Sequence, residues 1–111
     1  MAVTNTTIIS PKTAEAAQTV QYSSPAATRT TITKFTASNT TGATITLAVN
    51  LVPVEGTVGA SNLVVPAKAV QAGGVYSFPE LVGQVLAGGA AISTIASAAG
   101  LTISAAGAQE T

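Results

Sequence analysis

The amino-acid sequence predicts an all-β fold, a single antiparallel β-sandwich of seven to eight short strands. The 111-residue chain contains 18 threonines and many valines, which favour extended backbone. Turn-forming residues recur roughly every 8–12 positions, the spacing typical of sandwiches. In the clearest segments, apolar and polar residues alternate, as in strands with one buried face. A jelly-roll order and an immunoglobulin-like order both fit these observations.

The chain begins with a Thr- and Ala-rich stretch without a clear period. We interpret residues 1–16 as an extended N-terminal arm, so that the β-sandwich domain covers residues 17–111. Residues 19–22 form a short candidate strand, which ends at the turn signal Ser23-Ser24-Pro25.

The next two segments predict a β-hairpin. Residues 28–38 are rich in β-branched side chains, with Phe35 as the one large apolar residue. Asn39-Thr-Thr-Gly42 follows as a turn. From Thr44 the alternation is strict, and one face of the predicted strand is entirely apolar: Ile45, Leu47, Val49 and Leu51.

Glycines and prolines divide the second half of the chain. Residues 55–62 form a predicted loop. Residues 67–71 and 75–78 flank Ala72-Gly-Gly74, which predicts a second hairpin.

The last third contains the only helix signal. Pro79 and Glu80 predict one short helical turn near residues 80–86, because proline suits the first helical position and a carboxylate stabilises its positive end. Residues 90–97 and 101–106 are the closing strands, and the residues that follow are expected to form a tail.

The composition excludes most side-chain chemistry. The chain has no His, Cys, Asp or Trp, so a hydrolytic triad and a zinc site both lack their residues. Four isolated glutamates are a poor source of calcium ligands or paired carboxylates. We therefore expect that the protein is not an enzyme, that it has no catalytic residues, and that it binds neither a metal nor a cofactor. The four basic residues are scattered, which argues against nucleic-acid binding.

Neither secretion nor membrane insertion is predicted. The N-terminus lacks the basic and apolar regions of a signal peptide. The uncharged window Leu81–Leu101 is long enough to span a bilayer. Gly88-Gly89 and several hydroxyl residues interrupt it, so no span is expected.

The small number of charged residues indicates that neighbouring subunits cover much of the protein surface. Only 7% of the residues are charged, whereas roughly 25–35% of the surface is charged in a typical soluble free domain. Threonine and serine could hydrate the surface instead, but we favour assembly. Candidate interface residues are Tyr76, Glu80, Lys34, Lys68 and Glu55. For Glu80, the alternatives are stabilisation of the helical turn and an ion pair to Lys34 or Lys68 of another subunit.

Two motifs carry a family resemblance. Leu51-Val-Pro53, followed by a Gly-rich loop, precedes the stretch Ala72-Gly-Gly-Val-Tyr76-Ser-Phe-Pro-Glu80-Leu-Val-Gly-Gln-Val-Leu86. Together with the Asn39-Thr-Thr-Gly42 turn, this pattern resembles small β-sandwich virion proteins of tailed bacteriophages. The likeness covers about residues 28–106.

The resemblance implies a non-enzymatic structural protein located in the virion, which assembles in the bacterial host cytoplasm. The expected role is a head decoration or cement protein. Its expected partners are the major capsid protein or other virion proteins and copies of itself, with a trimer as the first expectation. The alternative is a neck, tail or fibre-associated protein that binds a receptor or glycan.

Overall fold

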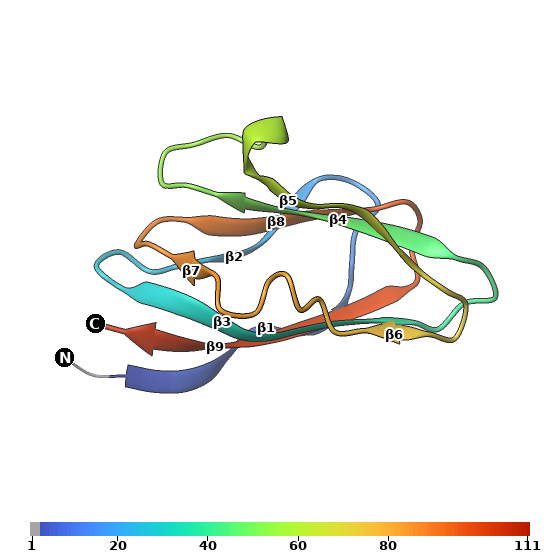
Figure 1. Cartoon of the computed structure of the whole chain (residues 1–111), viewed down its shortest axis with the longest axis horizontal. Helices are drawn as coiled ribbons and strands as arrows, with labels where there is room; N and C mark the ends of the chain where they lie inside the picture. Colours follow the sequence, from blue (N-terminus) through green and yellow to red (C-terminus); the bar gives the residue numbers. More distant parts are fainter. Residues whose placement is uncertain (1–2) are drawn as a thin grey trace.

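Two antiparallel sheets pack face to face, which confirms the predicted β-sandwich (Figure 1). The computed structural model describes residues 3–111. The first sheet contains β1 (Val3–Thr13), β3 (Arg29–Asn39), β6 (Val75–Tyr76), β7 (Val85–Leu86) and β9 (Leu101–Glu110). The second sheet contains β2 (Thr19–Ser23), β4 (Ile45–Val52), β5 (Leu63–Val70) and β8 (Ala91–Ala96).

The strand order identifies the sandwich as a jelly roll. The first sheet has the order β1-β9-β3-β6, with β7 also paired to β3, and the second has the order β2-β8-β4-β5. Each early strand pairs with a late one: β1 with β9, β2 with β8, β3 with β6 and β7, and β4 with β5. This is a long antiparallel ribbon rolled up into two sheets. Of the two orders that periodicity allowed, the jelly-roll order is the one observed.

The core lies between the sheets, on the faces that alternation predicted. Alternate residues are buried in β9 (Leu101, Ile103 and Ala105) and in the first part of β4 (Ile45, Leu47 and Val49). Leu51, predicted on the same face of β4, is half-buried. Phe35 and Phe78 are fully buried, with ring centroids 5.2 Å apart in an edge-to-face arrangement. A φ of 39° at Phe78 redirects the chain just before Pro79. These two rings are the largest side chains of the core.

The N-terminal segment is part of the sandwich and not a separate arm. Residues 3–13 are extended, as expected, but they form an edge strand that pairs with β9. Ile8 and Ile9 are buried in the core, together with Ala14. The boundary predicted at residue 17 is therefore wrong for the residues described. The first two residues of the predicted arm lie outside them.

The predicted hairpin between β3 and β4 is also wrong, because these strands lie in different sheets. Asn39 explains the change of sheet. Its Nδ2 donates to the carbonyls of Ala43 at 2.7 Å and Val70 at 2.9 Å. Its Oδ1 accepts from the backbone N–H of Thr41 at 2.9 Å. The Asn-Thr-Thr-Gly sequence does form a turn, and the buried amide directs that turn toward the other sheet.

The second predicted hairpin fails in the same way. The turn is present, since the N–H of Gly74 donates to the carbonyl of Gln71 at 2.8 Å and Gly73 has a φ of 71°. However, β5 precedes it in one sheet and β6 follows it in the other.

The segment after Pro79 forms consecutive tight turns. Leu81, Val82 and Gln84 each donate to the carbonyl three residues earlier, and Val85 and Leu86 are then extended. Within residues 3–111, the one helical turn is the 3₁₀ segment Ala60–Asn62. The expected tail is also ordered: residues 107–110 belong to β9, because β1 and β3 pair with them on both sides.

Candidate interaction surfaces

Three candidate interface residues form one cluster at the β5 and β6 side of the sandwich. The hydroxyl of Tyr76 donates to the Glu80 carboxylate, with Oε1 at 2.8 Å and Oε2 at 3.1 Å. The Nζ of Lys68 lies 4.6 Å from the centre of the Tyr76 ring, within the range of a cation–π contact. Phe78 packs edge-to-face on the same ring at 4.7 Å. The Tyr76 ring therefore connects two exposed charged side chains, Lys68 and Glu80, to the buried core.

The Glu80 carboxylate raises the pKa of Tyr76, because its hydrogen bond favours the protonated phenol. Glu80 does not stabilise the start of a helix, because no helix begins there. The contact observed for its carboxylate is the hydrogen bond from Tyr76. An ion pair with a lysine of another subunit stays a prediction.

The other two candidate residues lie elsewhere. Lys34 is exposed on the outer face of the first sheet, where it lines a shallow hollow of about 250 Å³ with Thr7, Pro11 and Ser104. Glu55 is exposed in the loop after β4 and has a φ of 60°. The structure thus brings together Lys68, Tyr76 and Glu80, and it separates Lys34 and Glu55 from them.

Two asparagines hold the loop that contains Glu55. The Nδ2 of Asn50, on β4, donates to Asn62 Oδ1 at 2.8 Å and to the carbonyl of Gly59 at 3.1 Å. The Nδ2 of Asn62 in turn donates to the carbonyl of Thr57 at 2.8 Å. The loop therefore covers the outer face of β4, which explains why Asn50 is buried on that face.

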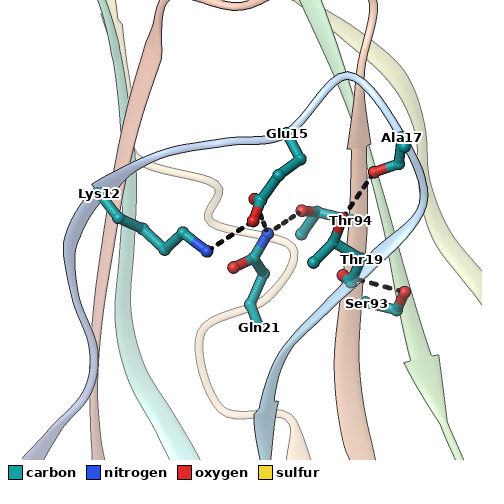
Figure 2. A network of polar contacts seen from close by, with 7 residues as sticks. All are labelled: Lys12, Glu15, Ala17, Thr19, Gln21, Ser93 and Thr94. Atoms are coloured by element: carbon teal, nitrogen blue, oxygen red, sulfur yellow. Dashed lines mark hydrogen bonds and ion pairs between the residues drawn. The ribbon is translucent and has the colours of Figure 1, made fainter.

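A polar network that the sequence did not predict ties the β1–β2 connection to β8 (Figure 2). Lys12 pairs with Glu15 at 2.9 Å. The Nε2 of Gln21 donates to Glu15 Oε1 at 2.9 Å and to the hydroxyl of Thr94 at 3.0 Å. The hydrogen bond from Gln21, then that from Lys12, lowers the pKa of Glu15 to about 2. No local pattern signals this network, because Gln21 and Thr94 meet only through the pairing of β2 with β8.

The hydroxyl of Tyr22 is used inside the chain. It accepts a hydrogen bond from the Nε2 of Gln109 at 2.6 Å and lies 2.9 Å from the hydroxyl of Thr30. Through these contacts, Tyr22 links β2 of one sheet to β3 and β9 of the other.

The outer face of the first sheet is built mostly from small uncharged side chains. Alternation places opposite to the core a set of half-buried residues of β3 and β9: Thr31, Thr36, Ser38, Thr102, Ser104, Ala106 and Ala108. At the margins of the same face, Val75 and Val85 are 65% and 52% exposed. Lys34 contributes a charge within it, and Arg29 pairs with Glu110 at one end.

The charged groups are mostly engaged within the chain. Lys12 pairs with Glu15, Arg29 pairs with Glu110, and Lys68 and Glu80 both contact Tyr76. Among residues 3–111, no group of three or more potential metal ligands comes together. In the same part of the chain, no helix is long and apolar enough to cross a bilayer.

Comparisons with protein-family models, with curated proteins and with solved structures found no match to this chain.

Proposed function

We propose that this protein is a non-enzymatic structural protein of a tailed-phage virion, a head decoration protein that stabilises the capsid through contacts between subunits. The observation that carries the proposal is the outer face of the first sheet, where most side chains of β3 and β9 are small and uncharged. Such side chains lose little rotamer entropy when a neighbour covers them.

The use of charge supports the same role. Six of the eight charged side chains contact a partner within the chain, so few remain for recognition of a charged ligand. A lattice protein does not need strong individual contacts, because symmetry repeats each modest contact many times over the shell. The jelly-roll order adds a fold-level analogy, since this fold recurs in viral capsid proteins and also in lectins.

The direct test is to add purified protein to phage capsids assembled without it. Binding at hundreds of copies per particle, together with a higher temperature of capsid disruption, is the expected result. Thr36→Lys/Ser104→Lys places two charges on the proposed contact face and should reduce binding. Ser61→Lys/Ser77→Lys adds the same charge at exposed positions outside it. Equal binding by all three proteins, or no binding by the wild type, contradicts the proposal.

The second candidate function is a receptor- or glycan-binding role on the neck, tail or fibre. The observation that favours it is the cluster of Lys68, Tyr76 and Glu80, which combines an aromatic ring with two polar groups. Copy number separates the two roles, because a tail component occurs in a handful to a few dozen copies per virion. Binding to a glycan array that is lost in Tyr76→Ala would support this second role.

A further inference from the structure

The four sheet edges of the molecule differ in how well they are protected against pairing with another strand. On the second sheet, the β5 edge carries Pro66, Lys68 and two register shifts. The opposite edge, β2, has five residues and one register shift. On the first sheet, one edge is divided into β6 and β7, of two residues each. Prolines, lysines, bulges and short strands are the features that block edge-to-edge association.

The remaining edge, β1, is protected over only half its length. From Ile8 onward, β1 contains Pro11, Lys12 and register shifts relative to β9. From Val3 to Thr7, the strand runs through five successive pairs with β9 without a shift, and it has no charge and no proline. Four of these five residues are exposed, and Thr6 is half-buried. In the part of the chain that the structure describes, β9 is the only strand that pairs with β1.

We propose that residues 3–7 of β1 pair antiparallel with the same residues of a second copy of this chain, so that the first sheets of two molecules become one continuous sheet. A strand is complementary to itself about a two-fold axis, and each backbone donor on one copy then meets an acceptor on the other. The register with Asn5 on the axis places Thr4 opposite Thr6 and Val3 opposite Thr7. No charged residue opposes another in this stretch, and hydroxyl pairs across strands are favourable.

This contact would be a two-fold interface, so the proposal predicts a dimer through β1 in place of the trimer of the first expectation. The proposal does not depend on the virion role, because self-association is measured on the purified protein alone and capsid binding on the particle.

The first test is the mass of the full-length chain in solution, by analytical ultracentrifugation over a range of concentrations. The expected mass is that of a dimer of this chain. Asn5→Lys/Thr7→Lys places like charges across the axis and should raise the dimer dissociation constant at least about tenfold. Ser10→Lys/Thr13→Lys adds the same charge at exposed positions in the second half of β1, and it should leave the dimer dissociation constant unchanged. Circular dichroism of both variants confirms that the sandwich is intact.

The second test uses single cysteines, since the natural chain has none. With Asn5 on the axis, Asn5→Cys forms a disulfide-linked dimer under mild oxidation, whereas Ser10→Cys does not. Cysteines at positions 3, 4, 6 and 7 identify the register if another residue lies on the axis. A monomeric mass at every concentration, a three-chain particle, or cross-linking no greater at positions 3–7 than at position 10 overturns the proposal.

Discussion

The side-chain Nδ2 of Asn39, at the end of β3, donates to the main-chain carbonyl of Val70, at the end of β5, at 2.9 Å and across 31 positions of the chain. The two residues belong to different sheets, and Asn39 is only 1% exposed. One buried amide thus holds the turn after β3 and fastens it to the opposite sheet.

Asn39→Ala should lower the free energy of unfolding by about 1–3 kcal/mol, because it leaves buried backbone groups without a partner. Thr44→Ala, an exposed position in the same connection, is the matched control and should stay within about 0.5 kcal/mol of the wild type. Urea unfolding followed by circular dichroism measures both. If the two variants lose the same stability, the role assigned to the amide is wrong.

The N-terminal strand should contribute to stability as a part of the core. Ile9 is 2% exposed, so Ile9→Ala should cost about 2–5 kcal/mol through lost burial and the cavity left behind. Ser10→Ala changes the adjacent exposed residue and should have little effect. Thermal and urea unfolding give the comparison. A neutral effect of Ile9→Ala would show instead that residues 3–13 act as an arm outside the cooperative fold.

Glu15 should make stability depend on pH at the acid end. Its pKa falls from 4.5 to about 2 on folding, mainly through the hydrogen bond from Gln21. The unfolded state therefore binds the proton first as pH falls. The stabilisation is complete above pH 4.5 and is lost as pH falls toward about 2.

Two variants isolate this effect. The stability difference between wild type and Glu15→Gln at neutral pH should shrink between pH 4.5 and about 2. Gln21→Met should raise the pKa of Glu15, measured by NMR titration of its carboxyl carbon. Ser23→Ala, an exposed change at the end of the same strand, should leave that pKa where it is. A wild-type Glu15 that titrates near 4.5 would contradict the network.

The contact between Tyr76 and Glu80 should be visible at high pH. Because the pKa of Tyr76 is raised above 10.0 by the carboxylate, Glu80→Gln should bring the ionisation back toward that value. NMR of ring-labelled tyrosine follows the titration. The same shift means that this contact stabilises the fold fully below pH 10.0 and less at higher pH. An identical titration of Tyr76 in Glu80→Gln would rule the hydrogen bond out.

Local patterns predicted the positions of most strands, while pairing and sheet membership depended on distant residues. Alternation assigned the buried face correctly in β9 and in β4 as far as Val49. The Asn39 turn was recognised, but the acceptor that directs it, Val70, lies far along the chain. Residues 3–7 carry little apolar signal because an edge strand of threonines buries little of itself.

The same limit applies to the candidate site. Tyr76, Glu80 and Lys68 were each recognised as unusual among so few charged and aromatic residues. The stacking of Lys68 on Tyr76 depends on β5 and β6 lying at neighbouring edges of two sheets. The network around Glu15 was missed, because neither Gln21 nor Thr94 differs locally from other polar strand residues.

The nested strand pairing also predicts an order of folding. Among the strands of residues 3–111, only β4 and β5 pair with a strand next to them in the sequence, whereas β1 pairs with β9, the last strand described. Closing a long loop costs more entropy than closing a short one. We therefore expect β4 and β5 to pair first and β1 and β9 to pair last, and we expect folding to be slow. The residues of β1, although synthesised before the other strands described, are thus expected to be among the last to pair.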